Sequence, residues 1–499
     1  MSDEKAFNPT PSVARVETVM IGIAPVAPQT AGAIGYLVGP DGDVPAALGL
    51  GRAALEAAGF DGAAGSALVV PNADGPTKVA VGIGRDAPDA AAVRNAAAAF
   101  ARACAKQAAL TVDLDDLVSG APDVAAQAVV EGVLLARYSY DPLRREPKGT
   151  DFSELTLVAD AAHHEALRPG AERGKALAAA TQLARDLANT PHSHLNATRL
   201  AEVAVAIGAE RGLEVEVFGK DALVEMGCGG LLGVNQGSAE EPRMIKLTYR
   251  PSSGEPTGRL ALVGKGIMYD SGGIALKPGD EVHAQMKNDM SGAAAILAAM
   301  AELADLGCPA QVTGWLMCTD NMPSGTALAL GDVVTMRGGT TVEVINTDAE
   351  GRLVMADALV LATEEPNDAI VDIATLTGAC MRALGTQVAG VIGSDQNLID
   401  QVRAAAEATD EPVWQLPLDK RYRNELDSTV ADLKNLGGAN AGAITAALFL
   451  AEFVGDVPWA HIDIAGTAQA SADAGWQTAG CTGFGARLLA ELAVRFTAR

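Results

Sequence analysis

The chain has 499 residues, of which 49% are hydrophobic and 20% charged, and its formal net charge at pH 7 is −25. At roughly 150 residues per domain, this length predicts two or three domains with a substantial buried core rather than extended disorder. The acidic surplus argues against general nucleic-acid binding, because phosphate backbones would be repelled.

The N-terminal region contains no basic stretch that leads into an apolar one, so we expect no signal peptide. The longest uncharged run, residues 18–40, is interrupted by Pro25, Pro28 and several glycines, which favours strand and loop over a membrane span. The six cysteines are scattered without a CxxC pair. This usage predicts reduced thiols in a cytoplasmic protein.

The first third of the chain alternates short apolar β-branched runs with Ala-rich helical runs. We expect strands over residues 16–23, 67–70, 78–81, 110–113 and 155–158, and helices over residues 90–107 and 124–138. This alternation predicts a smaller N-terminal α/β domain over residues 1–168.

A long helical stretch follows over about residues 172–188 and stops at Asn189-Thr-Pro191, because proline cannot continue a helix. We expect a connecting helix over residues 169–190 and a larger catalytic domain over residues 191–499. Its expected strands are 260–263, 311–317, 342–345, 370–373 and 460–464, and its expected helices lie near 290–305, 352–364, 397–408, 442–454 and 485–496. The fold class is therefore α/β, with two domains, the larger one built on a central mixed sheet flanked by helices.

The segment Asp270-Ser-Gly-Gly273 resembles the nucleophile segment of chymotrypsin-like proteases. A serine mechanism would need a histidine placed to take the proton of Ser271. None of the six histidines stands in the pattern of that family, and a helix-rich α/β chain does not suit its double β-barrel. A serine-type hydrolase using Ser271 is kept as a competing mechanism.

Acidic residues and lysines gather in short loops directly after the strongest strands of the second region. The expected strand 259–264 runs into a segment with Lys265, Asp270 and Lys277, and Asp289 precedes an Ala-rich helix. The later strand ends in Asn346-Thr-Asp-Ala-Glu-Gly-Arg-Leu353.

In that last segment, Asp348, Glu350 and Arg352 project to one side if the chain is extended. Carboxylates two residues apart repel one another unless a proton or a cation lies between them. If Asp270 and Asp289 join them, two divalent cations would balance the four negative charges, an arrangement known from two-metal hydrolysis.

Taken singly, Asp289 is best explained as a helix cap, Asp348 as a turn residue, and the two lysines as surface residues. Together, at strand ends in one domain, they favour a site. Since the chain has no HExxH motif, a metal site would use mainly oxygen ligands.

These segments resemble the leucyl aminopeptidase family of two-metal, cytosolic exopeptidases. The family signature stands unbroken at residues 346–353, and its Lys-Gly-x-x-aromatic-Asp-Ser-Gly-Gly segment stands at residues 265–273. Further matching stretches lie at residues 185–191, 375–379, 442–446 and 458–466. The resemblance covers essentially all of residues 185–499.

The resemblance implies that Asp270 and Glu350 bridge two divalent ions, Mn²⁺ or Zn²⁺. Lys265 and Asp289 would complete the tighter site, and Asp348 the looser one. A lysine ligand must be neutral, a state that a neighbouring dication can enforce.

The resemblance also implies that Lys277 stabilises the oxyanion and that Arg352 holds a bicarbonate ion, which acts as general base. The substrates would be peptides with a free N-terminal amine, with Leu and other large apolar residues preferred at the first position. The residues that match the family's substrate-binding positions are Met286, Thr375, Leu376, Gly378, Ala465 and Ala468.

The family assembles as a homohexamer, a dimer of trimers, and we expect the same here. One departure touches catalysis indirectly: the chain is one residue longer than usual between Lys277 and Asp289, which could shift the loop that aims Lys277. A third reading is a DNA-binding regulator with a residual peptidase fold. The net charge of −25 argues against it.

Overall fold

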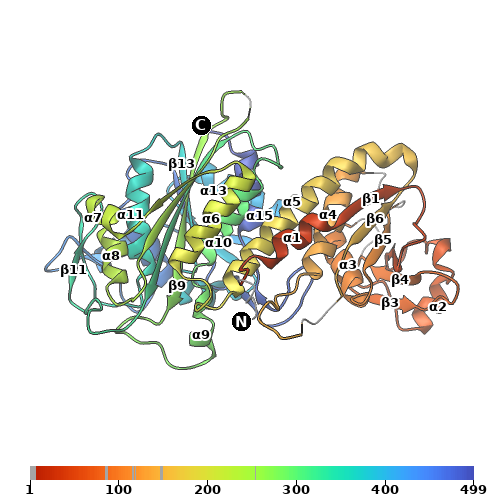
Figure 1. Ribbon diagram of the computed structural model, residues 1–499, viewed down its shortest axis with the longest axis horizontal. Helices are drawn as coiled ribbons and strands as arrows, with labels where there is room; N and C mark the ends of the chain where they lie inside the picture. Colours follow the sequence, from red (N-terminus) through yellow and green to blue (C-terminus); the bar gives the residue numbers. More distant parts are fainter. Residues whose placement is uncertain are drawn as a thin grey trace, which may run out of the picture. The chain divides into compact units, whose positions relative to one another are not determined.

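The computed structural model describes residues 7–84, 88–114, 117, 120–146, 150–252 and 254–498. The chain forms two compact units, Met1–Gln182 with Ser471–Ala479, and Leu183–Ala470 with Gly480–Arg499 (Figure 1). The expected two-domain α/β architecture with a larger second domain is confirmed. The boundary between the two units falls inside α5 (His164–Asn189). The division into an N-terminal domain up to residue 168, a connecting helix over 169–190 and a catalytic domain from residue 191 stays a prediction.

The sheet of the N-terminal unit has the strand order β1-β6-β5-β2-β4-β3 among the described residues. These strands are β1 (Met20–Ala24), β2 (Ala33–Val38), β3 (Ala67–Val70), β4 (Thr77–Gly82), β5 (Ala109–Asp113) and β6 (Glu154–Val158). Neighbouring strands pair in parallel, except that β3 is antiparallel to β4. The helices α3 (Ala90–Ala103) and α4 (Pro122–Ala136) pack together and contribute Phe100 and Leu134 to the core.

The expected strand over residues 16–23 is only half right. Residues Pro11–Thr18 form the helix α1, and the strand begins at Met20. Pro11 favours the first helical turn, and Ser12 and Val16, four residues apart, face the core together. The predicted strand therefore joined two different elements, because Val16 belongs to the helix α1 and the strand begins only after Val19. A short helix, α2 (Arg52–Ala57), and a 3₁₀ turn, Ala46–Leu48, follow β2.

A segment from the C-terminal part of the sequence, Ser471–Ala479, belongs to the N-terminal unit. Trp476 is buried in that unit's core, and its backbone N–H donates to Asn95 Oδ1 at 3.1 Å. Arg102 donates to the backbone carbonyls of Gly475 and Gln477. The N-terminal unit is thus completed by residues that are remote in the sequence.

The sheet of the C-terminal unit has the order β15-β14-β17-β13-β9-β10-β8-β7 among the described residues. Its strands are β7 (Glu214–Phe218), β8 (Arg243–Tyr249), β9 (Arg259–Asp270), β10 (Gln311–Asn321), β13 (Ala369–Ala374), β14 (Ala389–Gly393), β15 (Val413–Gln415) and β17 (Trp459–Asp463). The central strands β17, β13, β9 and β10 are parallel, whereas β8, β7 and β14 pair antiparallel. The predicted mixed sheet is confirmed.

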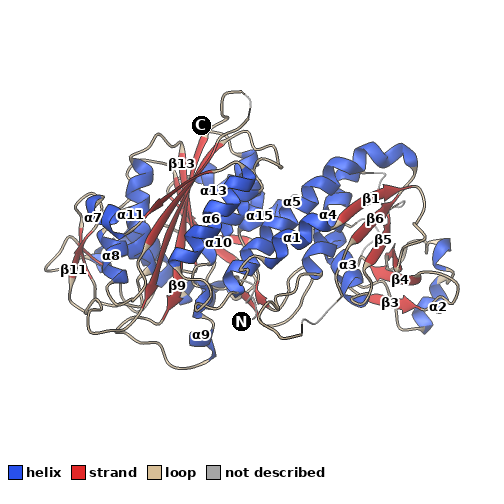
Figure 2. Cartoon of the chain, in the orientation of Figure 1, coloured by secondary structure: helices blue, strands red, loops and turns tan. Residues whose placement is uncertain are grey.

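Helices cover both faces of this sheet. In Figure 2 the strands run between α6 and α10 on one side and α8 and α11 on the other. The first layer consists of α6 (Ala197–Arg211), α10 (Ser291–Ala301), α13 (Gln396–Thr409) and α15 (Ala486–Arg495), and the second of α8 (Gly229–Asn235), α11 (Gly351–Thr363) and α14 (Gly442–Ala451). The predicted helices near 290, 352, 397, 442 and 485 are all present.

The remaining elements are short. They are α7 (Lys220–Glu225), α9 (Glu281–Ala284), α12 (Gly378–Leu384), the 3₁₀ turns Ala161–His163, Met286–Asn288 and Lys420–Leu426, and the small strands β11 (Val333–Thr335), β12 (Thr341–Glu343), β16 (Leu433–Lys434), β18 (Gln469–Ala470) and β19 (Gly480–Cys481). In the part of the chain that the structure describes, every helix is too short or too polar to cross a bilayer.

Candidate metal centre

The predicted site residues converge at the carboxyl edge of the central parallel strands. Lys265 and Asp270 both lie in β9, which extends to Asp270, and Asp348 and Glu350 lie in the loop before α11. Parallel strands end at the same edge of a sheet, so the loops that follow them meet there. The 12-residue strand β9 ends at Asp270, within this group of loops.

Lys265 lies at the centre of the first group of charges. Its Nζ is 2.7 Å from Asp289 Oδ2 and 2.8 Å from Glu350 Oε1, and it donates to the carbonyl of Thr375 at 3.0 Å. The three charged side chains are 3–5% exposed. Gly351 makes this approach possible, because a Cβ at that position would lie 2.6 Å from Lys265 Cε.

Lys277 lies at the centre of the second group. Its Nζ is 2.8 Å from Asp270 Oδ2 and 2.5 Å from Asp348 Oδ1. The side chains of Lys277 and Asp348 are 18% and 35% exposed, so this half of the site is the more open one. Gly272 has φ +86°, and a Cβ there would lie 2.9 Å from Asp348 Oδ1. The glycine is therefore needed for the turn that returns Lys277 to Asp270.

The carboxylates are close enough to share cations. One oxygen each from Asp270, Asp289 and Glu350 lies within 4.8 Å of the other two, and all three residues are buried. With Asp348, four carboxylates face two lysine ammonium groups, so negative charge is left over. Buried oxygen donors with surplus negative charge fit hard or borderline divalent cations.

The pKa values of the carboxyl groups also reflect this surplus of buried negative charge. Burial raises the pKa of Asp270 to about 6, and the charge of Glu350 adds to the effect. Burial also raises the pKa of Asp289 and of Asp348. Ionised carboxylates in this place need compensation by positive charge.

The lysines supply part of that compensation. Burial alone would raise the pKa of Glu350, but Lys265 and Lys277 outweigh it and lower that pKa. Burial would lower the pKa of both lysines, yet the surrounding carboxylates raise it. Both amines are therefore protonated when no other cation is bound.

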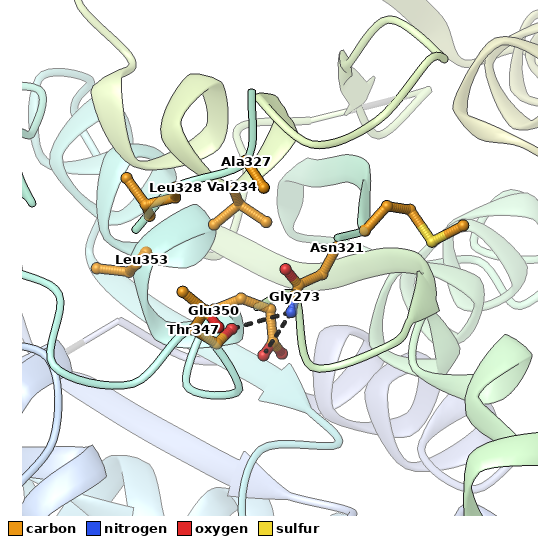
Figure 3. A pocket seen from close by; sticks show the side chains of 9 residues that line it. Val234, Gly273, Asn321, Ala327, Leu328, Thr347, Glu350 and Leu353 are labelled. Carbon is orange, nitrogen blue, oxygen red and sulfur yellow. Dashed lines mark hydrogen bonds between the residues drawn. The ribbon is translucent and has the colours of Figure 1, made fainter. Parts of the chain in front are cut away.

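Asn321, the last residue of β10, is a site residue that the sequence analysis missed. Its Nδ2 donates to Asp270 Oδ1 at 2.8 Å and to the carbonyl of Thr347 at 2.9 Å, and lies 3.4 Å from Glu350 Oε2. Figure 3 shows the amide aimed at Glu350 and Thr347 beside a small pocket. That pocket is lined by Val234, Gly273, Asn321, Met322, Ala327, Leu328, Thr347, Glu350 and Leu353. The predicted strand 311–317 stopped four residues short of Asn321, because β10 continues to that residue (Gln311–Asn321), so the amide was not recognised as lying at a strand end.

Arg352 lies in the first turn of α11 and is 4% exposed. Its Nε and Nη1 have no hydrogen-bond partner among the described residues. Burial lowers the pKa of Arg352 to about 10, against the opposing effects of Glu350 and Asp463. Two buried N–H donors of a cation, free to bond, are suited to a small anion.

The predicted substrate-binding residues fall into three groups. Thr375 and Met286 both contact Asp289, one of the predicted metal ligands. Thr375 Oγ1 donates to Asp289 Oδ1 at 2.7 Å, and the carbonyl of Met286 accepts from Asp289 N at 3.4 Å. Leu376 N and Ala465 N both donate to Asp463 Oδ1, at 3.3 and 3.1 Å.

Gly378, at the start of α12, and Ala468, which is buried, have no hydrogen bond to these carboxylates among the described residues. Asp463, at the end of β17, is a second residue that the sequence analysis missed. It fixes the two backbone segments that contain Leu376 and Ala465.

Ser271 is not arranged as a nucleophile. Its Oγ donates to the backbone carbonyl of Asn321 at 2.6 Å and accepts from Gly273 N at 3.2 Å. Both partners are backbone groups, and neither can serve as a general base. The longer segment between Lys277 and Asp289 forms α9, capped by Asp280, and Lys277 still reaches Asp270.

Comparison with known proteins gives two matches to family models. Residues 182–490 match the catalytic domain of the cytosol aminopeptidase family, and residues 45–147 match its N-terminal domain. A probable cytosol aminopeptidase of Chlorobaculum tepidum is 48% identical over 74% of this chain and 75% of its own length. One of Streptomyces avermitilis is 45% identical over 80% of this chain and 78% of its own length.

Solved structures give the same picture. The bottromycin maturation enzyme BotP in complex with Mn is 39% identical, with a TM-score of 0.85 over 93% of this chain and 99% of its own. A variant of tomato leucine aminopeptidase is 30% identical, with a TM-score of 0.87 over 96% of this chain and 97% of its own.

Proposed function

This chain belongs to the cytosol aminopeptidase family and is a metal-dependent aminopeptidase, and we propose that five of its residues would hold two divalent ions for the reaction. The observation that carries the proposal is the buried group of oxygens from Asp270, Asp289 and Glu350 within 4.8 Å of one another. In this assignment Asp270 and Glu350 would be shared by both ions, Lys265 and Asp289 would complete one site, and Asp348 would complete the other.

The difference in burial supports this division. Lys265 and Asp289 are 3% and 5% exposed, whereas Asp348 is 35% exposed, so the Asp348 site would exchange its ion more readily. The ions, when bound, supply Lewis acidity that acidifies water and polarises the scissile carbonyl. Mn²⁺ or Zn²⁺ suits a set of oxygens with one amine.

Lys277 keeps its proton in this mechanism. Its Nζ lies between Asp270 and Asp348, on the more open side of the site where a substrate would enter. An ammonium group there would stabilise the negative charge that develops on the attacked carbonyl oxygen. Lys277 is thus assigned as a catalytic residue.

Arg352 is assigned to hold bicarbonate, which would supply a general base. The support is that Nε and Nη1 are buried and have no partner among the described residues. The oxygens of a bicarbonate ion accept hydrogen bonds, and such N–H groups of a buried cation could donate to them. Ser271, whose hydroxyl bonds to backbone, has no role in this mechanism.

The substrates we propose are peptides with a free N-terminal amine, with Leu and other large apolar residues preferred. Met286, Thr375, Leu376, Gly378, Ala465 and Ala468 would form the pocket and hold the substrate backbone. Likeness to a leucine aminopeptidase over 96% of the chain supports this preference.

For assembly and location, we propose a homohexamer in the cytoplasm. The family names of the relatives and the six buried cysteines without a disulfide support the location. Light scattering that gives the mass of a single 50.8 kDa chain would contradict the hexamer.

The proposed function is tested with leucine p-nitroanilide as substrate. Hydrolysis should stop after chelation, return with Mn²⁺, and fall by at least about 100-fold in Asp348→Ala. Ser271→Ala is the control and should keep most of the activity. Turnover that ignores the chelator and disappears in Ser271→Ala would overturn the metal mechanism.

A further inference from the structure

A buried acid–imidazole pair lies in the sheet close to the proposed catalytic group. Asp372 on β13 and His461 on β17 stand directly opposite each other in register. His461 Nδ1 is 2.5 Å from Asp372 Oδ1, and Trp459 Nε1 donates to Asp372 Oδ2 at 2.6 Å. All three side chains are at most 1% exposed. Such a pair, fully removed from solvent, holds the imidazole in one orientation.

The pair leaves one nitrogen of His461 available. A carboxylate only accepts hydrogen bonds, so Nδ1 carries the hydrogen that faces Asp372. The other ring nitrogen, Nε2, is buried and has no hydrogen-bond partner among the described residues. A buried polar atom without a partner is costly, which indicates that it bonds to a small molecule.

His461 faces the same layer as Arg352. In parallel strands, residues in register point to the same face, and Val263, Asp372 and His461 form one such row across β9, β13 and β17. Val263 packs in the core cluster that also contains Leu353 of α11, so this face carries α11. Arg352 stands next to Leu353, in the first turn of that helix.

The charges of these groups act on one another's pKa values. Burial and the charge of Arg352 act to lower the pKa of His461, but Asp372 and Asp463 outweigh them, so this pKa is raised. Asp463 acts on the pKa of Arg352 as well. The layer thus contains Nε and Nη1 of Arg352 and Nε2 of His461, three buried nitrogens that have no hydrogen-bond partner within the described part of the chain.

We propose that His461 is a positioning residue for Arg352, acting through one buried water that bonds to both Nε2 and the guanidinium. Water donates and accepts, so it satisfies Nε2 in either protonation state. Asp372 holds the ring, the ring holds the water, and the water fixes the plane of the guanidinium. The proposal rests on the anion-binding role of Arg352 given above.

Two variants of the same residue separate this role from a structural one. In His461→Asn, the amide nitrogen can take the place of Nδ1 and keep the bond to Asp372, but nothing replaces Nε2. In His461→Gln, the longer amide reaches the place of Nε2. We expect kcat for leucine p-nitroanilide to fall at least about tenfold in His461→Asn and less than about threefold in His461→Gln, with KM unchanged in both. The reverse order, with Asn tolerated and Gln impaired, would mean that only the pairing with Asp372 matters and would overturn the proposal.

The Arg352→Gln background tests whether His461 acts through Arg352. There, His461→Asn should cost less than about twofold, because the group it positions is gone. An equal loss in both backgrounds would overturn the proposal. If Arg352→Gln itself matches the wild type, the anion role of Arg352 is wrong, and the structural measurement below decides the water bridge alone.

A crystal structure gives a readout that does not depend on turnover. The wild type should show one ordered oxygen within about 3 Å of both Nε2 and a guanidinium nitrogen. In His461→Asn that oxygen should be displaced and the guanidinium rotated. The absence of a shared oxygen in the wild type would overturn the proposal.

Discussion

Lys265, as the metal ligand proposed above, would have to lose its proton when metal binds. Without metal its ammonium group lies 2.7 Å from Asp289 and 2.8 Å from Glu350, and these carboxylates raise its pKa. A cation that replaces this ammonium as partner of both carboxylates must displace its proton before the amine can act as a ligand.

We therefore expect proton release on Mn²⁺ binding at pH 8, with about one proton fewer in Lys265→Gln than in the wild type. The measurement is calorimetry in buffers of different ionisation enthalpy. Lys277→Gln is the matched control, because Lys277 keeps its proton in the proposed mechanism. Equal release in the wild type and Lys265→Gln would show that Lys265 is not a ligand.

Asn321 joins the two carboxylates proposed to bridge the metals. Its single amide bonds to Asp270 at 2.8 Å and lies 3.4 Å from Glu350, so it fixes their separation. Residues that orient metal ligands in this way are typically worth 10–100-fold in metal affinity or activity.

Asn321→Ala should accordingly weaken Mn²⁺ binding or kcat/KM by about 10–100-fold. Asn367→Ala is the control, since the side-chain amide of Asn367 donates to the backbone carbonyl of Ala362 in α11, at 2.8 Å, and not to one of the site carboxylates. Equilibrium dialysis with metal analysis measures the affinity. A loss no greater than that of the control would remove Asn321 from the site.

At the scale of elements, α11 carries the end of the family signature and is tied to its neighbours by Asp357. This buried carboxylate accepts from Leu231 N, at the start of α8, and from Arg337 N, both at 2.9 Å. Burial raises the pKa of Asp357 to about 7, against the opposing effect of these bonds.

In the unfolded chain this pKa is about 4, so between pH 4 and pH 7 the folded state binds more protons than the unfolded state. The contribution of Asp357 to the free energy of unfolding therefore falls as the pH rises, by up to about 1.4 kcal/mol per pH unit. Asp357→Asn removes this term. Urea denaturation of both metal-free proteins should show that the wild type loses stability relative to the variant between pH 4 and pH 7. A difference that stays constant over this range would contradict the raised pKa.

At the scale of the whole molecule, the N-terminal unit depends on a segment that comes late in the sequence. Trp476 is 4% exposed and lies in the core formed with α3 and α4. Removal of a buried tryptophan side chain costs about 3–5 kcal/mol.

Trp476→Ala should therefore speed amide hydrogen exchange in α3 and α4 and leave β9 and β13 unchanged. Trp414→Ala is the matched control, because Trp414 is 65% exposed. Exchange that rises equally in α3 and β9 would show that the two units unfold together.

The part of the fold and site that the sequence predicted depends on local patterns. Hydrophobic period and strand-end loops predicted the two α/β units, and the unbroken run at residues 346–353 together with Lys265 and Asp270 predicted the metal centre. Such patterns are written in neighbouring residues, so they are readable without coordinates. The strand over residues 16–23 failed because the first half of that segment is the end of α1, with Val16 buried on the helix.

The remaining features were decided by tertiary structure. Asn321 meets Asp270 across 51 residues of sequence, His461 meets Asp372 across 89, and Trp476 meets Asn95 across 381. The residues next to each of these in the sequence do not indicate its partner. Its role arises only when the fold brings that distant partner within hydrogen-bond distance. Local propensity and charge pattern therefore determined which chemistry the chain carries. Non-local packing decided which side chains hold that chemistry in place, because the partners are set by the order of strands and not by distance along the chain.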